Sequence, residues 1–448
     1  GVVLDALVVE QGFSVSVAGA GTGIFFATSG IAGYFAGGLL SKFDARLVMT
    51  IGSLIGAMGL ALLGQVRNET QMVIVMIIFG IGFALTSLVP GSTIVTRWFV
   101  RKRSVALSIA SSGLSLGGIA ITPVIATIID ADSLVYWAPR IAVAFLIGML
   151  PAVWFLIHPA PEPLGLRPDG DPPLTPGAPP PATQGIDFKQ AVRSRYFILL
   201  SVTFIIVMAA QVGAIQHTFK MTKDRIDIET ARTTLMVLSG TSVVARIVGG
   251  LVALKVSVTR LTAFLMGVQS LGIAILAVSD TTFMVLLGAV ILGTSMGNLL
   301  MFHPLLLADA FGIKDYARIY GMGSLLMIIG VGTGPFVVGF LRDVSSYRTA
   351  FGVLTVLALA GLVFLAAAGK PPSDQTATTK VDLDIEIRKN VEPSNKAPRT
   401  LTPPHRIEQP STPRNRRVAV IDRGSAMSDD TFEVPESVVK KIPLKSSE

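Results

Sequence analysis

Long apolar segments follow one another along most of the chain, and this succession constrains the fold more than any other feature. A helix needs about 20 predominantly apolar residues to cross the hydrocarbon core of a bilayer. Eleven segments approach or exceed that length, and residues 1–9 predict the last turns of a further helix that is otherwise largely missing from the sequence. We therefore expect an all-α integral membrane protein with twelve helices. The eleven expected spans lie near residues 17–40, 47–66, 71–96, 104–129, 140–157, 196–218, 231–254, 260–279, 282–308, 319–341 and 348–368.

The composition excludes several other classes of protein. Hydrophobic residues make up 51% of the chain and charged residues only 15%, which is typical of a polytopic membrane protein. There is no cysteine, and four histidines stand without metal-like spacing, so we expect no disulfide, no metal site and no cofactor. No nucleotide-binding loop or catalytic constellation is found, so an enzyme is not expected. The net charge of +8 does not indicate nucleic-acid binding, because most basic residues lie in short loops and in the tail.

Two polar stretches divide the chain into four parts. Residues 158–195 are rich in Pro and Gly and predict a flexible linker. Residues 370–448 are polar and rich in charge and Pro, and they predict a disordered tail with at most a short element near 381–387. The remaining residues form two expected six-helix bundles, at 1–157 and 196–369.

Basic residues are concentrated in the loops of one side, which also carries the linker and the tail. The opposite loops hold fewer basic residues and mix them with acidic ones. The positive-inside rule then predicts that linker and tail are cytoplasmic and that the protein lies in the plasma or inner membrane. The basic loop residues of the first side are Lys42, Arg46, Arg97, Arg101, Lys102, Arg103, Lys255, Arg260, Lys314 and Arg318.

The two halves echo each other. The second and the eighth expected helices both end in a pair of glycines and continue into a short basic turn. Repeated halves with a central site are typical of secondary transporters, whose halves rock about a site near the middle of the membrane.

One charged residue interrupts the expected span from Thr233 to Leu254. Arg246 lies about ten residues from the end of that span, so its guanidinium is expected near the middle of the bilayer. Since a charge there costs at least about 2.5 kcal/mol, it should face a cavity or a partner. A substrate-facing role is one interpretation; an ion pair with another helix, or a side chain that extends to the membrane edge, is the alternative. Small and hydroxylated residues share its helix face: Ser239, Ser242, Gly249 and Gly250.

Other polar residues within the spans are weaker candidates. Gln211 and Asn298 can hydrogen-bond an anion, and Tyr34 can donate to one. His217 and His303 are candidates for a proton-linked role. The alternatives are a position at the membrane interface for His217 and a bond to a neighbouring carbonyl for His303. Two further stripes are interpreted as helix packing: Ser104, Ser108, Ser111 and Ser115, and Gly330, Gly332 and Gly334.

The loop from Gly37 to Arg46 resembles the signature loop of the major facilitator superfamily, Gly-x-x-x-Asp-Arg-x-Gly-x-Arg. Gly37, Lys42 and Arg46 fit this pattern and are expected to form a gating loop. Ser41 stands where the usual Asp is expected, and Asp44 where the usual Gly is expected. The resemblance implies a bundle of six plus six membrane helices with pseudo-twofold halves.

Further segments are similar to the monocarboxylate porter and oxalate–formate antiporter branch of that superfamily. They include the basic turn at 97–106, the start of the central loop at 164–170, the turn at 308–312 and Gly334-Pro335. In that branch an arginine of the eighth helix binds the substrate carboxylate, and Val244-Ala245-Arg246 matches its motif. Proton-coupled members carry an Asp at the position of Ser242, so the resemblance does not imply a proton-carrying carboxylate here. No lysine occurs between residues 320 and 341, which favours a monoanion over oxalate.

The sequence thus predicts a monomeric secondary active or facilitative transporter of a small, monocarboxylate-like organic anion, with the lipid bilayer as its surroundings. Symport, exchange and uniport stay open. One alternative is a sensor or scaffold on a transporter fold, acting through the tail, whose arginines lie near Ser and Thr residues and fit anionic lipid or phosphorylation. Another is a transporter of a neutral or cationic small molecule.

Overall fold

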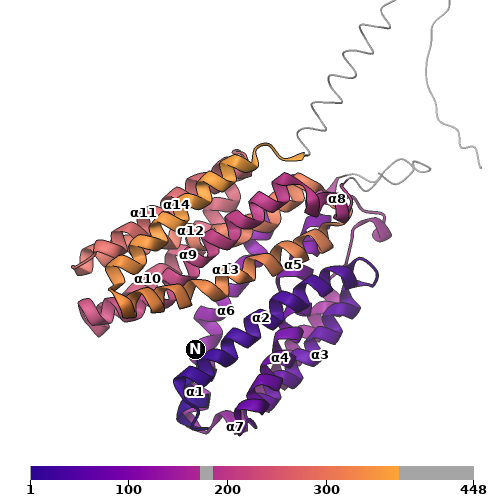
Figure 1. Ribbon diagram of the computed structural model, residues 1–448. Coiled ribbons are helices and arrows are strands. Elements are labelled where there is room, and N and C mark those ends of the chain that lie inside the picture. The colour runs from indigo at the N-terminus through magenta and orange to yellow at the C-terminus, as the bar shows by residue number, and fades with distance from the viewer. Residues whose placement is uncertain (1, 172–184, 373–448) are drawn as a thin grey trace, which may run out of the picture. The chain divides into compact units, whose positions relative to one another are not determined.

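The computed structural model describes residues 2–171 and 185–372, and the named elements of these residues are all helices (Figure 1). The middle of the linker and the tail with the element expected near 381–387 lie outside the described residues. The helices are α1 (Val2–Val9), α2 (Val15–Leu40), α3 (Ala45–Leu63), α4 (Glu69–Thr86), α5 (Leu88–Trp98), α6 (Arg103–Ala131), α7 (Leu134–Pro151), η1 (Ala152–Leu156), η2 (Glu162–Leu164), η3 (Pro168–Gly170), α8 (Phe188–Arg193), α9 (Arg195–Arg225), α10 (Ile228–Val252), α11 (Val258–Val278), α12 (Thr282–Phe311), α13 (Tyr316–Val344) and α14 (Tyr347–Ala368).

The helices confirm the predicted all-α membrane architecture. Within the described residues, ten candidate spans are long and apolar enough to cross a membrane. Many of their large apolar side chains are exposed, among them Phe283, Phe336 and Val363. Exposed apolar surface of this extent is expected where a protein meets lipid, so the chain is a multi-pass membrane protein.

The expected span at 71–96 is interrupted. Helix α4 ends at Thr86, Ser87 takes a non-helical conformation (φ −101°, ψ −123°), and α5 begins at Leu88. Pro90 is the cause, because a proline has no N–H for the carbonyl four residues earlier and its ring clashes with that carbonyl. That carbonyl belongs to Thr86, the last residue of α4.

Side-chain caps fix where several other spans begin. Ser133, Ser194, Asp227 and Ser346 each accept a hydrogen bond from a backbone N–H in the first turn of the helix that follows. Such caps satisfy N–H groups that have no acceptor within the helix. The expected span at 140–157 therefore starts earlier, after Ser133.

The two halves, α1–α7 and α9–α14, share a hydrophobic core at one end. One cluster of buried residues joins Leu40 and Leu107 of the first half to Phe302 and Tyr320 of the second, and it includes Ala191 of the linker helix α8. We call this end the linker end. Two further clusters stay within one half each, at residues 6–138 and 210–358. Beyond the linker end, each half therefore has a core of its own.

Glycines allow the halves to approach closely at the linker end, where α2 packs on α13 (Figure 1). A Cβ on Gly37 would lie 2.2 Å from the carbonyl oxygen of Ala317, and one on Gly30 would lie 2.7 Å from a side-chain carbon of Ile328. These distances are too short for any other residue. At Gly37 the backbone of α2 therefore contacts the backbone of α13, and at Gly30 it contacts a side chain of α13.

The described parts of the linker fasten to both halves. The carboxylate of Asp169 accepts hydrogen bonds from the backbone N–H groups of residues 100–102, at 2.8 to 3.2 Å. On the other side, Ile186 N–H donates to the carbonyl of Phe311 at 2.9 Å, and Phe188 N–H donates to the carboxylate of Asp315 at 2.8 Å. The linker therefore contacts the turn before α6 and the turn before α13.

Candidate functional site

Arg246 lies at the interface between the halves, on α10, and is only 2% exposed. Its Nη1 donates to the carbonyl oxygen of Ser111 on α6 at 2.5 Å, and the hydroxyl of Ser108 donates back to the carbonyl of Arg246 at 2.5 Å. One turn away, the hydroxyl of Ser104 donates to the carbonyl of Gly250 at 2.9 Å. The serine stripe of α6 thus packs against α10, as predicted for Ser104 and Ser108.

The hydrogen bonds of Ser104, Ser108 and Arg246 follow one another along α6 and α10, away from the ion pair of Arg103. On α10, Ala253 packs against the shared cluster and Leu238 belongs to the second half's own cluster, so Arg246 lies between the two.

Neither alternative interpretation of Arg246 is observed. Within residues 2–171 and 185–372, no acidic side chain pairs with its guanidinium, and the side chain is buried instead of reaching the membrane edge. Its Nε has no hydrogen-bond partner among the described residues. A buried guanidinium with a free donor and no counter-charge is suited to an anion, because charge-assisted bonds to carboxylate are strong.

Ser242 and Asn298 lie beside Arg246. A Cβ on Gly297 of α12 would lie 2.8 Å from the Arg246 Nε and 2.9 Å from the Ser242 hydroxyl oxygen. The Asn298 amide nitrogen donates to the carbonyl of Ala245 at 2.9 Å. Gly297 is therefore required for α12 to pass so close to the polar face of α10.

The same stretch of α12 also receives Gln211. The amide nitrogen of Gln211, on α9, donates to the carbonyl of Met296 at 3.3 Å. The Gln211 Oε1, the Asn298 Oδ1 and the Ser242 hydroxyl are buried and without a hydrogen-bond partner in the described residues. The structure thus brings four of the predicted site residues together around residues 296–298.

Tyr34 lies elsewhere. Its ring is 6.5 Å from the ring of Phe188 in the linker helix, and its backbone packs on Gly321 of α13. Its position at the linker end gives no support to a role beside Arg246.

The three residues of the expected gating loop do not form a charge network between the halves in the described residues. Gly37 contacts α13, as described above, whereas Lys42 is exposed. Arg46 is bound to the end of its own half: Nε donates to the carbonyl of Ile157 at 2.6 Å, and Nη2 lies 2.6 Å from Nδ1 of His158. The ion pair that does join the halves here is Arg103 to Asp309, at 3.3 Å.

The two histidines have contrasting environments. His303 is fully buried against the rings of Phe204 (4.6 Å) and Tyr320 (5.6 Å), and neither ring nitrogen has a partner in the described part of the chain. The expected alternative of a bond to a carbonyl is therefore not observed. His217 is half-buried, and its Nε2 lies 3.0 Å from the carbonyl of Pro335. Neither ring contacts Arg246.

Sequence reasoning missed three features of this site: the acceptor carbonyl of Ser111, the close passage at Gly297, and the ion pair from Arg103 to Asp309. Main-chain acceptors and helix crossings have no residue-type signal. The charges at Arg103 and Asp309 were visible, but their pairing depends on how the halves meet. Among the described residues, no group of three His, Asp or Glu side chains is placed to hold a metal ion.

Comparisons with known proteins agree with this architecture. Residues 1–306 match the family model described as Major Facilitator Superfamily. The chain is 24% identical over 346 residues to the MFS transporter asaE of Aspergillus flavus, which covers 75% of this chain and 74% of that protein.

Two solved structures have similar folds, each with a TM-score of 0.62. One is the human organic anion transporter MFSD10 (TETRAN), at 14% identity, covering 81% of this chain and 88% of that chain. The other is the E. coli fucose:proton symporter FucP, at 17% identity, covering 82% and 95%. At these identities the likeness concerns the fold alone.

Proposed function

Because this chain belongs to the Major Facilitator Superfamily and is a membrane transporter, we propose that its substrate is a small organic anion, of the monocarboxylate class, held by Arg246. The observation that carries the proposal is the buried guanidinium with no acidic partner in the described residues and an unused Nε donor. A cation would be repelled at such a site by Coulomb forces that a low dielectric strengthens.

The neighbours of Arg246 complete a site for a carboxylate. A Cβ on Gly297 would lie within 3 Å of both the Ser242 hydroxyl and the Nε of Arg246, so the two donors are neighbours. Both could bind one carboxylate once α12 moves away from this face of α10. The amide nitrogen of Gln211 donates to a carbonyl of α12, and that of Asn298 donates to a carbonyl of α10. The two amides would orient the rest of the substrate through their free oxygens, which accept hydrogen bonds from a hydroxyl.

The contact with Ser111 suggests how binding and movement are coupled. The Ser111 carbonyl now accepts the bond from Nη1. A substrate carboxylate is a better acceptor for a guanidinium than a neutral carbonyl. Substrate would therefore replace Ser111 and remove one of the hydrogen bonds that join α10 to α6. The bonds from Ser104 and Ser108 would have to break as the halves rock in alternating access.

The distribution of basic loops favours a cytoplasmic linker end. We therefore propose that residues 1–157 and 196–369 are the rocking units, that linker and tail are cytoplasmic, and that the described conformation is closed towards the cytoplasm. The shared core at the linker end and the separate cores beyond it support this assignment.

The fold by itself does not select the substrate. One similar structure is described as an organic anion transporter and the other as a fucose:proton symporter. The choice of an anion rests on Arg246, with support from the resemblance of residues 244–246 to the carboxylate-binding motif. No carboxylate stands at position 242, so the proposal includes no proton-carrying acid there.

Uptake into liposomes tests this function. Labelled lactate, pyruvate, formate, oxalate and a neutral sugar would be supplied with and without a pH gradient. Arg246→Ala should reduce uptake by at least about 100-fold, because two charge-assisted bonds of about 1.5–3 kcal/mol each are lost. Arg232→Ala is the matched control, since Arg232 is on the same helix but exposed and paired with Glu229. Normal uptake by Arg246→Ala, or transport of a neutral sugar and of none of the anions, would refute the proposal.

A further inference from the structure

An open groove of about 500 Å³ lies on the second half, between the start of α9 and the end of α14. The two helices pack against each other, and both are candidate membrane spans. Four apolar residues form its walls: Ile198 and Leu199 of α9, and Val363 and Phe364 of α14. Ile198 is 51% exposed and Val363 is 68% exposed. The groove therefore faces the lipid that surrounds the helices and not the core of the protein.

Two arginines form the rim of this groove. Arg193 is in the last turn of the linker helix α8, and Arg195 is the first residue of α9. Both are exposed, and within residues 2–171 and 185–372 neither makes an ion pair with a carboxylate. No acidic residue is among those that line the groove. Its charge is therefore positive throughout.

The end of α14 fixes the position of Arg195. The Nη2 of Arg195 donates to the carbonyl of Ala367, in the last turn of α14, at 3.1 Å. The last carbonyls of a helix have no partner within the helix and carry partial negative charge, so they stabilise a guanidinium. A guanidinium has five N–H donors, and this is the one hydrogen bond that Arg195 makes in the described part of the chain. It is therefore held beside the groove with donors left for an anion.

The charges and the apolar walls lie at different depths. Ile198 and Leu199 follow Arg195 along α9, which places them about 4–6 Å further from the linker end at about 1.5 Å of rise per residue. Helix α14 runs the opposite way, and Val363 and Phe364 come about one turn before its end at the linker end. The groove thus has positive charge at the linker end and apolar side chains deeper in the membrane. A phospholipid has the same order, with its phosphate at the surface and its acyl chains inside.

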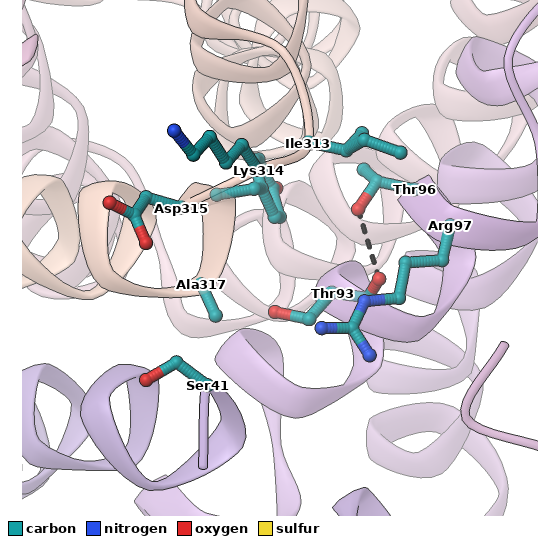
Figure 2. A pocket seen from close by; sticks show the side chains of 9 residues that line it. Ser41, Thr93, Thr96, Arg97, Ile313, Lys314, Asp315 and Ala317 are labelled. Atoms are coloured by element: carbon teal, nitrogen blue, oxygen red, sulfur yellow. Dashed lines mark hydrogen bonds between the residues drawn. The ribbon is translucent and has the colours of Figure 1, made fainter. Parts of the chain in front are cut away.

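A second recess at the linker end has charges of both signs. It lies between the halves, and Arg97 and Lys314 share its wall with the carboxylate of Asp315 (Figure 2). Its volume is about 110 Å³. The groove of α9 and α14, in contrast, is lined by two arginines and by apolar side chains. Of the two, this groove is therefore the one that suits a ligand with a negative head and an apolar tail.

We propose that this groove binds an anionic phospholipid, with its phosphate between Arg193 and Arg195 and an acyl chain over the four apolar residues. Basic residues beside membrane helices attract anionic lipids, which are concentrated in the cytoplasmic leaflet. The proposed orientation places the linker end in that leaflet, while binding itself requires only that α9 and α14 lie in a bilayer. The site is separate from Arg246, so the inference does not depend on an anionic substrate.

A fluorescent label beside the groove tests the proposal without any transport assay. The chain has no cysteine, and Leu359, one turn deeper than Val363 on α14, is 47% exposed. The full chain with labelled Leu359→Cys would be placed in nanodiscs of phosphatidylcholine. A small fraction of the lipid carries a quenching nitroxide on its acyl chain and is either phosphatidylglycerol or phosphatidylcholine. Each basic residue near a membrane surface favours an anionic lipid by roughly fivefold, so the two arginines predict about 25-fold tighter association of phosphatidylglycerol.

Two variants and two controls complete the test. Arg193→Gln should lower the preference about fivefold, and Arg193→Gln combined with Arg195→Gln should abolish it. Arg193 makes no ion pair or hydrogen bond in the described residues, so its substitution separates lipid binding from folding. Arg260→Gln should leave the preference intact, because Arg260 is an exposed arginine at the start of α11 that does not line the groove. A label at Leu54→Cys, which is 50% exposed on α3, should be unaffected by the arginine substitutions.

Three results would overturn the proposal. The first is equal association of the two lipids at Leu359→Cys in the parent, and the second is a preference that survives the loss of both arginines. The third concerns the tail, which follows α14 in the sequence and alternates apolar with acidic residues at 381–387. If neither lipid quenched the label at Leu359→Cys while both quenched the label at Leu54→Cys, protein would cover the groove in place of lipid.

Discussion

Gly37→Ala should open the linker end, because the new methyl group cannot fit between α2 and α13. A Cβ at this position would lie 2.2 Å from the Ala317 carbonyl oxygen, 2.8 Å from its carbon and 3.1 Å from the Arg318 Cα. Ordinary contact begins at 3.4 Å, so the shortfall to the oxygen is 3.4 − 2.2 = 1.2 Å. All three atoms are backbone atoms, so no side chain can rotate away.

The cost can be estimated from the overpacking of cores, which is about 1–3 kcal/mol. The penalty applies only while α2 and α13 are in contact. It should therefore shift the equilibrium between the closed and the open linker end by about 5- to 150-fold towards open, at 1.4 kcal/mol per tenfold. Gly38→Ala is the matched control, because a Cβ on Gly38 meets nothing within 4 Å.

The assay uses Ser92→Cys as an alkylation reporter in detergent, because the chain has no cysteine and Ser92 of α5 is 7% exposed within the contact between the halves. Gly37→Ala should raise its alkylation rate by the same factor, while Gly38→Ala should leave the rate of the parent unchanged. Circular dichroism and gel filtration would verify that both variants are folded. Equal alkylation rates in the two folded variants would refute the reasoning that Gly37 permits closure.

Two further predictions concern the site and the linker. Gly249→Ala should abolish uptake of the transported anion without loss of folding, since its Cβ would lie 2.0 Å from the Asn298 Oδ1 and would displace that side chain. Gly240→Ala is the control and should transport normally, because its Cβ would meet nothing within 4 Å. Normal uptake by Gly249→Ala would contradict the assigned place of Asn298. Asp169→Asn should increase protease cleavage of the linker at neutral pH: burial alone would raise the pKa of Asp169, but the N–H groups of residues 100–102 hold it below 3.8. The contact of the parent linker with residues 100–102 should therefore persist at neutral pH and be lost only as the pH falls through that lowered pKa. If the parent were cleaved as fast as Asp169→Asn at neutral pH, the role of the carboxylate would be contradicted.

Much of the fold follows from the sequence because the bilayer imposes a length on each apolar segment. All eleven expected spans contain a helix, and the interruption at Ser87 could have been predicted from Pro90. The arrangement of Arg246, Ser242, Asn298 and Gln211 was harder to foresee. Their burial could be predicted, because each is a polar residue within an apolar span. That the four side chains lie close together could not, because it depends on where α12 crosses α10 at Gly297.

Tyr34, the remaining candidate for substrate binding, and Arg46, a candidate for the gating loop, have other surroundings for identifiable reasons. Tyr34 lies one turn from Gly37, on the part of α2 that packs against α13 at the linker end. Arg46 fits the signature pattern, yet its hydrogen bonds run to Ile157 and His158 within its own half. A motif thus specifies which residue is present, whereas the hydrogen-bond partner of that residue depends on which helices pack together.

Binding of carboxylates to the purified protein tests the central claim most directly, because it requires no turnover. Thermal unfolding of the full chain in detergent would be followed with lactate, pyruvate, formate and a neutral sugar, for the parent, Arg246→Ala and Arg232→Ala. The account predicts that at least one monocarboxylate raises the unfolding temperature of the parent and of Arg232→Ala, and that Arg246→Ala shows no shift. An equal shift in Arg246→Ala, or stabilisation of the parent by the sugar alone, would contradict it.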